Sequence, residues 1–229
     1  ETLRKINPSP YMYYIKFSDF FIVGSSPETL VKVEKNKVTI KPIAGTRLKE
    51  KGKEKEIKED LLSDPKELAE HLMLLDLGRN DVGRVSKVGS INVKESFQIQ
   101  ETSHLYHIYS TVEGDLNPEE DRVSALCAGF PAGTVTGAPK IRAMEIINEI
   151  EDRKRGIYSG AIGYFSSSGD MDTAIALRTA VIKDNKMYVQ AGGGVVYDSD
   201  EEYEFNETLN KAQALFSAAK EVLTKQEIK

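Results

Sequence analysis

The chain contains 229 residues, of which 40% are hydrophobic and 29% charged, with a formal net charge of −5. This composition is typical of a folded domain, and the interspersed acidic and basic residues offer no basic field that would attract nucleic acid. No run approaches the ~20 apolar residues that a membrane-spanning helix needs. The single cysteine, Cys127, excludes an internal disulfide framework and fits a reducing compartment, so we expect a cytoplasmic protein.

The N-terminal part of the chain predicts strands. The sequence shows no signal peptide and no initiator methionine, so we expect a fragment or excised domain of a longer protein. After the proline-punctuated turn NPSPYM, the runs YYIKF and FFIVG favour two strands, with GSSPETL as the connecting turn. LVKVE and KVTIKPIAGT alternate apolar and polar residues around residues 35–37, which indicates a hairpin. Residues 49–60 carry mixed charge and are expected to form an exposed loop or helix start.

A helix is predicted over DPKELAEHLMLLDLGRND. Asp64 suits the N-cap, Pro65 suits the first helical position, and Gly78 or Asn80 is expected to end the helix. Its expected apolar stripe is Leu68, Leu72 and Leu75. Glu67 and Glu70 lie three residues apart on a neighbouring stripe.

The middle of the chain mixes strands and helices. GSINV and SFQIQ favour strands, and in the strand that follows them His104 and His107 fall on opposite faces, so they are not joint metal ligands. A helix is expected to begin over residues 121–127. In the glycine- and proline-rich loop GFPAGTVTGAPK, we expect Thr134 and Thr136 to be exposed. Pro139 opens an amphipathic helix over residues 139–151.

The later part of the chain returns to strands, at AIGYF, TAIALRTAVI and KMYVQA, with turns at residues 169–170 and 184–185. Arg178 is expected in the middle of a strand among apolar residues, where a guanidinium needs a carboxylate or a bidentate ligand anion. Strands clustered early and late, with helices between and after them, predict an α+β fold.

Residues 190–211 combine glycines with charge. Gly192, Gly193 and Gly194 offer backbone N–H groups, and the following helix carries Glu204, Glu207 and Lys211 on one face. With Glu67 and Glu70 this is a second helix-borne acid pair, and two such pairs can surround a divalent cation with oxygen ligands. A solvated acidic helix after a flexible turn is the simpler alternative. Nucleotide and Cys/His metal motifs are absent, so the residues favour a magnesium-dependent enzyme acting on a small polycarboxylate.

Several blocks resemble the signatures of the chorismate-utilising enzymes, most closely the large subunits of anthranilate synthases. In chain order the blocks are NPSPYM, GSSPE, PIAGT, AEHLMLLDLGRND, SHLYHI, FPAGTVTGAPKIRAMEII, RGIYSGAIGY, MDTAIALRT and QAGGGVVYDSD. The resemblance implies an α+β fold with extended antiparallel sheets and helices packed outside. It also implies that residues 1–229 are a catalytic domain that lacks the family's N-terminal part.

The resemblance implies roles for individual residues. Glu70 and Glu207 match magnesium ligands, and Glu67 and Glu204 match acids that act through bound water. His107 matches the candidate general acid beside the departing 4-hydroxyl of chorismate, and Thr134 matches a polar pocket contact. The matched substrate-binding residues are Tyr158, Arg178, Gly192, Gly193, Gly194 and Lys211. Half of the family's tryptophan feedback site is matched by Asn7, Pro8, Ser9, Pro10, Tyr11 and Met12.

The reaction that the resemblance implies is the first step of tryptophan biosynthesis. Ammonia from a separate glutaminase subunit adds at C2 of chorismate, the 4-hydroxyl leaves as water, and elimination of pyruvate gives anthranilate. Aminodeoxychorismate synthases carry a lysine where Ala44 stands in PIAGT, so Ala44 favours direct addition of ammonia. The alternatives are an aminodeoxychorismate, isochorismate or salicylate synthase, or a regulatory or structural fragment that is catalytically incomplete.

Overall fold

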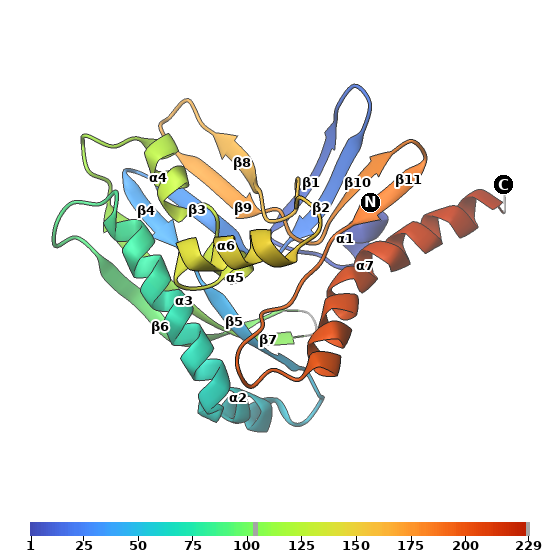
Figure 1. Cartoon of the computed structure of the whole chain (residues 1–229), viewed down its shortest axis with the longest axis horizontal. Coiled ribbons are helices and arrows are strands. Elements are labelled where there is room, and N and C mark those ends of the chain that lie inside the picture. The colour runs from blue at the N-terminus through green and yellow to red at the C-terminus, as the bar shows by residue number, and fades with distance from the viewer. Residues whose placement is uncertain (103–104, 228–229) are drawn as a thin grey trace. The chain divides into compact units, whose positions relative to one another are not determined.

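The computed structural model describes residues 1–102 and 105–227, so His104 lies outside the described residues. The helices are α1 (Thr2–Ile6), α2 (Glu54–Ser63), α3 (Pro65–Gly83), α4 (Arg122–Gly129), α5 (Gly133–Thr136), α6 (Lys140–Ile150) and α7 (Glu201–Glu227). The strands are β1 (Tyr11–Lys16), β2 (Phe21–Ser26), β3 (Thr29–Glu34), β4 (Lys37–Ile40), β5 (Ile43–Leu48), β6 (Asn92–Glu101), β7 (Leu105–Asp115), β8 (Ala161–Phe165), β9 (Met171–Ile175), β10 (Thr179–Lys183) and β11 (Lys186–Val189). Figure 1 shows these elements.

The chain forms two compact units. Unit 1 comprises residues 1–28, 153–162 and 174–229, and unit 2 comprises residues 29–152 and 163–173. Both units combine an antiparallel sheet with helices, so the predicted α+β fold class is confirmed. No helix within residues 1–102 and 105–227 has the length and apolar character that crossing a bilayer requires.

Unit 1 is a four-stranded antiparallel sheet in the order β1-β2-β10-β11, covered on one face by α1 and α7. Leu3, Ala180, Leu215 and Ala218 form its buried core. Apolar residues of the strands alternate so that one face meets the helices, which is the pattern expected of a half-buried sheet.

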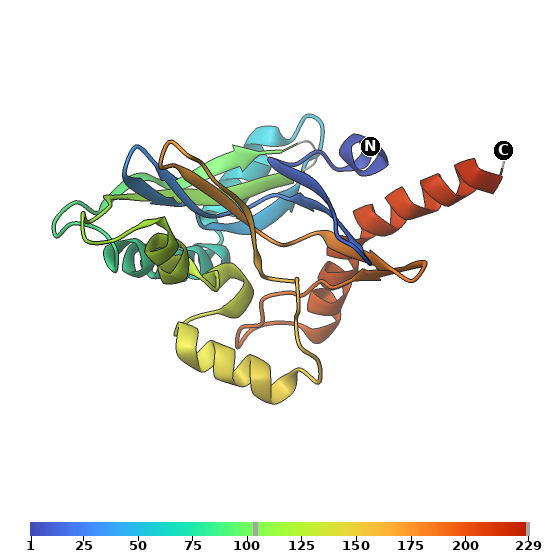
Figure 2. The same ribbon diagram turned by 90° about the horizontal axis from the view of Figure 1, so that it is seen from above.

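Unit 2 is built on the long strand β7. The sheet order is β5-β7-β4-β3-β9-β8, and β6 also pairs with β7. Helix α3 packs against β5, β7 and β4, and Figure 1 shows it running along the sheet. Figure 2 shows α6, in yellow, apart from the strands of this unit. This placement agrees with the absence of any buried residue in α6, whose expected apolar face is largely exposed at Ile141 and Ile150.

The turns and the helix start follow the sequence. Lys35 and Asn36 have φ values of 50° and 60°, and Asp184 and Asn185 have 50° and 57°, as tight hairpin turns require. The side chain of Asp64 accepts hydrogen bonds from the backbone N–H groups of Lys66 and Glu67, which confirms the predicted N-cap of α3.

The predicted end and apolar stripe of α3 were wrong in part. The helix continues to Gly83, because buried Gly78 lets it lie close to Ile40 and Val112 of the sheet. Leu72 is exposed, and the buried face instead includes His71 and Leu74.

Three strand boundaries also differ from the expectation. GSINV and SFQIQ belong largely to one strand, β6, which bends through register shifts and has a φ of 50° at Phe97. GSSPETL is mostly strand, since only residues 27 and 28 separate β2 from β3. TAIALRTAVI is two strands, β9 and β10, in different sheets.

His71 is a buried histidine in unit 2. Its Nε2 lies 2.7 Å from the Ser110 hydroxyl, and its ring packs edge-on against Phe97 at 4.9 Å between ring centroids. Its Nδ1 has no hydrogen-bond partner among the described residues. Burial disfavours the imidazolium and lowers the pKa of His71 from 6.5 to about 4.

We predict that this histidine makes unit 2 acid-sensitive. Between pH 6.5 and 4, His71 is protonated in the unfolded chain but stays neutral in the folded chain. The free energy of unfolding should therefore fall by up to about 3 kcal/mol as the pH drops through this range. Urea unfolding across this range should show a flatter pH profile for His71→Leu than for the wild type. Parallel profiles would contradict the prediction.

Candidate functional site

The glycine segment of unit 1 meets the charged face of α7. Gly192 follows β11, and its carbonyl accepts a hydrogen bond from Lys211 Nζ at 3.2 Å. The same ammonium pairs with Glu207 Oε2 at 2.9 Å. One lysine therefore joins the glycine backbone to Glu207, and its pairing with Glu207 agrees with the predicted shared helix face.

Glu204 and Glu207 converge on Gly193. A Cβ built at Gly193 would lie 3.1 Å from Glu207 Oε2 and 3.3 Å from Glu204 Oε2, so a larger residue would displace the carboxylates. The other oxygen of Glu204 accepts a hydrogen bond from the Ser199 hydroxyl at 2.9 Å. Both carboxylates lie beside the same glycine, and carboxylate oxygens are the donors that Mg²⁺ prefers, so the chemistry of these residues fits the expected ion.

Tyr158 reaches the same segment. Its hydroxyl lies 3.1 Å from the position of a Cβ at Gly192, and the Arg155 guanidinium lies 5.6 Å from the centre of its ring. Unit 1 thus brings together Tyr158, Lys211 and the first two glycines, all of which the sequence assigned to substrate binding.

Arg178 is not in the middle of a strand. It lies in the connection between β9 and β10 with a φ of 46°, a left-handed conformation that residues other than glycine seldom adopt. Burial lowers the pKa of its guanidinium, and the charge of buried Glu28 opposes this effect. Its guanidinium makes no hydrogen bond or salt bridge with residues 1–102 or 105–227, which leaves its donors available to an anion. Glu28 is buried between β2 and β3, whereas a surface turn at GSSPETL predicts an exposed side chain there.

In unit 2, His107 is held by the PIAGT strand. Strand β5 bulges between Ala44 and Thr46, where Gly45 has a φ of 69°. His107 Nδ1 lies 3.1 Å from both the Gly45 carbonyl and the Thr46 hydroxyl. Because a carbonyl can only accept, Nδ1 donates to it, and Nε2 is then the nitrogen that can exchange a proton with a ligand.

Glu67 reaches the same bulge from the first turn of α3. Its Oε1 accepts a hydrogen bond from Arg47 Nη1 at 3.0 Å, and its Oε2 lies 3.1 Å from the position of a Cβ at Gly45. Glu70 follows on the same helix and is half-buried. The predicted general acid and one predicted metal-site acid therefore meet at Gly45.

Arg47 is a site residue that the sequence reasoning missed. Burial by itself would lower the pKa of its guanidinium, but hydrogen bonds to Asp60, Asp64 and Glu67 raise it overall. Asp60 lies on α2, Asp64 joins α2 to α3, and Glu67 lies on α3, so the three acids share no single helical stripe. Only the packing of β5 against both helices brings the three acids to Arg47, so helical spacing provided no signal for this contact.

Thr134 lies in the short helix α5, not in an exposed loop. Gly133 packs so closely on Leu77 that a Cβ there would lie 2.3 Å from Leu77 Cδ2, and this contact draws the segment inward. The Thr134 hydroxyl is buried and has no hydrogen-bond partner among the described residues. Thr136 is half-buried and donates to the Ala132 carbonyl at 2.9 Å. The expected exposure of both threonines was therefore wrong.

The two acid pairs belong to different units. Among residues 1–102 and 105–227 no group of three or more His, Cys, Asp or Glu side chains is close enough to hold a metal ion. The four-glutamate magnesium site therefore stays a prediction.

The NPSPYM segment links α1 to β1. Asn7 caps α1, and its carbonyl accepts a hydrogen bond from the Ser25 hydroxyl at 2.6 Å. Met12 packs against the core of unit 1. Pro8, Ser9 and Pro10 connect the two elements, and the tryptophan role of this segment stays a prediction.

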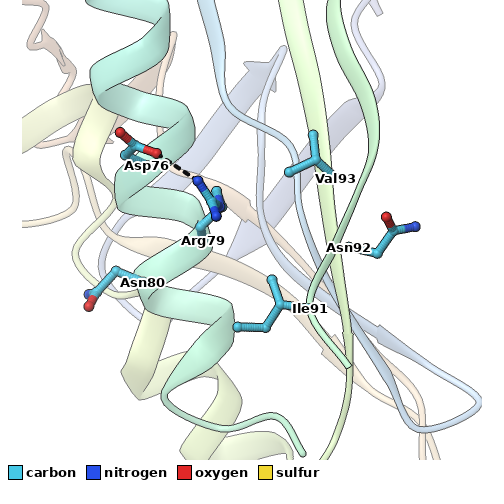
Figure 3. Close-up of a pocket in the computed structure, with 6 residues that line it drawn as sticks. All are labelled: Asp76, Arg79, Asn80, Ile91, Asn92 and Val93. Atoms are coloured by element: carbon cyan, nitrogen blue, oxygen red, sulfur yellow. Dashed lines mark hydrogen bonds and ion pairs between the residues drawn. The ribbon is translucent and has the colours of Figure 1, made fainter. Parts of the chain in front are cut away.

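A pocket of 530 Å³ lies between α3 and the start of β6, and Figure 3 shows the side chains that line it. Its lining residues are Asp76, Arg79, Asn80, Ile91, Asn92 and Val93. Asp76 and Arg79 form an exposed ion pair at 3.2 Å. None of the residues that the sequence assigned to the site lines this pocket.

Comparison with known proteins identifies the family. The family model for chorismate binding enzymes matches residues 1–217. The chain belongs to this family. The predicted resemblance to chorismate-utilising enzymes is therefore confirmed.

The similar proteins include anthranilate synthase components. Anthranilate synthase component 1 of Cereibacter sphaeroides is 58% identical over 222 residues, which cover 96% of this chain and 44% of that protein. The crystal structure of anthranilate synthase component I from Streptococcus pneumoniae matches with a TM-score of 0.86 and 51% identity, over 92% of this chain and 47% of that chain. The menaquinone-specific isochorismate synthase of Escherichia coli has a TM-score of 0.85 but only 26% identity, over 95% of this chain and 50% of that chain. The chain thus spans less than half the length of the Cereibacter relative.

We predict that Gly45 cannot be replaced without moving Glu67. Gly45→Ala adds a Cβ that lies 3.1 Å from both Glu67 Oε2 and Leu61 Cδ1, and it imposes a positive φ on alanine. Gly52→Ala is a matched control, because Gly52 also has a positive φ but no atom within 4 Å of its Cβ position. The control should lose about 1–2 kcal/mol of stability from backbone strain. Gly45→Ala should lose about 1–3 kcal/mol more, from crowding, in urea unfolding. Equal losses would show that the site tolerates the methyl group.

Proposed function

We propose that this chain carries the reaction of anthranilate synthase component 1, which converts chorismate and ammonia to anthranilate, pyruvate and water. The observation that carries the proposal is 58% identity to such a component over 96% of the chain. The convergence of Gly193, Glu204, Glu207 and Lys211 within unit 1 supports it, because the resemblance assigns these residues to the metal and substrate.

Magnesium is the proposed cofactor. Glu204 and Glu207 would hold it in unit 1, and the resemblance adds Glu67 and Glu70 of unit 2. When bound, Mg²⁺ neutralises the ring carboxylate of chorismate and fixes the ring. The convergence of two carboxylate oxygens at Gly193 supports this role.

His107 is the proposed proton donor. Ammonia bonds to C2 of chorismate, the ring double bonds shift, and the bond from C4 to its hydroxyl breaks. The hydroxyl takes a proton from His107 Nε2 and leaves as water. Elimination of pyruvate, with loss of the proton from C2, then aromatises the ring. The hydrogen bond from Nδ1 to the Gly45 carbonyl supports this assignment, because it orients the ring and fixes which nitrogen carries the transferable proton.

Arg178 and Tyr158 are proposed to grip the enolpyruvyl carboxylate. Gly192, Gly193, Gly194 and Lys211 add donors to the substrate carboxylates, and Thr134 is a polar pocket contact. The buried Thr134 hydroxyl supports this role, because it has no partner within the described part of the chain. A carboxylate would also relieve the cost of burying the Arg178 guanidinium.

The proposed partners follow the family. A component 1 implies a second component, which we propose to be a glutaminase that supplies ammonia. Tryptophan is proposed as a feedback inhibitor that contacts Asn7, Pro8, Ser9, Pro10, Tyr11 and Met12. The single cysteine favours a cytoplasmic setting.

We predict anthranilate fluorescence when the chain is incubated with chorismate, Mg²⁺ and ammonium. Glu207→Gln should abolish turnover, because the amide cannot replace a carboxylate ligand of Mg²⁺. Glu202→Gln, at an exposed position of the same helix, should retain it. Aminodeoxychorismate or isochorismate as the product would overturn the proposed reaction. Absence of any chorismate turnover would favour the catalytically incomplete alternative.

We predict that Arg178→Lys lowers kcat/KM by about 10- to 100-fold although the charge is kept, because lysine lacks the planar fork that binds a carboxylate through two parallel hydrogen bonds. Arg142→Lys serves as the control, since Arg142 is an exposed residue of α6 that pairs only with Glu145 and Glu149 among the described residues. Steady-state kinetics with chorismate measures both variants. Similar kcat/KM values for the two variants would contradict the assignment of Arg178 to substrate binding.

A further inference from the structure

Arg47 binds three carboxylates from two helices. Its Nε donates to Asp60 Oδ2 at 2.8 Å, its Nη2 to Asp64 Oδ2 at 2.6 Å, and its Nη1 to Glu67 Oε1 at 3.0 Å. Asp60 is 62% exposed, whereas the side chains of Asp64 and Glu67 are 29% and 20% exposed. The ion pairs with Asp64 and Glu67 are therefore the better shielded from water.

The fork of Arg47 controls where Glu67 points. One glutamate oxygen is bound to Nη1, and the other then lies over the Gly45 bulge, whose carbonyl accepts from His107 Nδ1. The Asp64 oxygen that Arg47 does not bind caps the backbone N–H of Lys66 at 2.9 Å. Arg47 thus fixes both the Glu67 side chain and the first turn of the helix that carries it.

We infer that Arg47 is a positioning residue that holds the second oxygen of Glu67 in the orientation used for magnesium binding. This inference rests on the proposed function, in which Glu67 contacts the ion through bound water. A glutamate on a half-exposed helix face otherwise samples several rotamers, and holding one rotamer in advance removes that entropy cost from metal binding. Lysine at this position keeps the charge but cannot bind three carboxylates with a rigid fork.

A merely structural role would be different. In that case Arg47 only joins β5 to α2 and α3, and its loss would weaken metal binding by the same factor whether or not residue 67 is a carboxylate. If Arg47 acts through Glu67, its loss has no further effect once Glu67 is replaced. A double-mutant cycle on metal affinity therefore separates the two roles.

The probe is Mn²⁺, whose binding in the presence of chorismate is followed by electron paramagnetic resonance. The variants are Arg47→Lys, Glu67→Gln and the pair combined, at a temperature where far-UV circular dichroism shows all of them folded. Arg47→Lys should raise the Kd for Mn²⁺ by about 10-fold, as the loss of a residue that orients a metal-site ligand does. Combining it with Glu67→Gln should leave the Kd of the single Glu67→Gln variant unchanged. Asp60→Asn is the matched control, because it removes the exposed pair of the same guanidinium, and its Kd should match the wild type.

Each outcome decides a different point. Equal Kd values for the wild type and Arg47→Lys, or an equal loss in both backgrounds, overturn the positioning role and leave the proposed function standing. A wild-type chain that binds no Mn²⁺ with chorismate overturns the magnesium assignment and the inference with it.

Discussion

Glycines allow carboxylates to approach the backbone in both units of this protein. At Gly193 two glutamates of α7 come within 3.1 and 3.3 Å of the place where a Cβ would stand, and at Gly45 Glu67 does the same at 3.1 Å. The acids that the sequence resemblance assigns to magnesium therefore lie against positions without a side chain. Gly45 also turns its carbonyl toward His107, so one bulge serves an acid and a histidine together.

Ion pairs with lysine neutralise some of the acidic side chains, and these pairs differ in how far they are exposed to water. Lys211 pairs with Glu207 at a half-exposed position, where an ion pair adds little to stability. Lys140 pairs with Asp81 at 2.8 Å, with side chains only 12% and 5% exposed. Burial raises the pKa of Asp81, and Lys140 opposes this effect, so removing either partner would leave an uncompensated buried charge. That pair holds the start of α6 to α3, although the rest of α6 has no buried residue.

Much of the site could be predicted from the sequence, because it depends on local spacing. Helical periodicity alone places Glu204, Glu207 and Lys211 on one face of α7. The glycines precede this helix by only a few residues, so they lie near its start. The Asp64 cap and the hairpin turns follow from single residues whose preferences are strong. The predicted position of Arg178 in the middle of a strand was wrong because apolar residues lie on both sides of the connection between β9 and β10. These strands belong to different sheets, and an apolar pattern in the sequence does not reveal where the chain passes from one sheet to another.

The sequence by itself determined the fold class, the family and the identity of the charged residues, since each is carried by short motifs or by periodicity. The tertiary structure alone decided which oxygen of Glu67 is bound, which nitrogen of His107 donates, and that Arg47 joins Asp60, Asp64 and Glu67. Those facts depend on the register of β5 against β7 and on the packing of α3 across them. Contacts between segments distant in the chain leave no periodic trace, because they are set by how whole elements pack and not by the preferences of neighbouring residues.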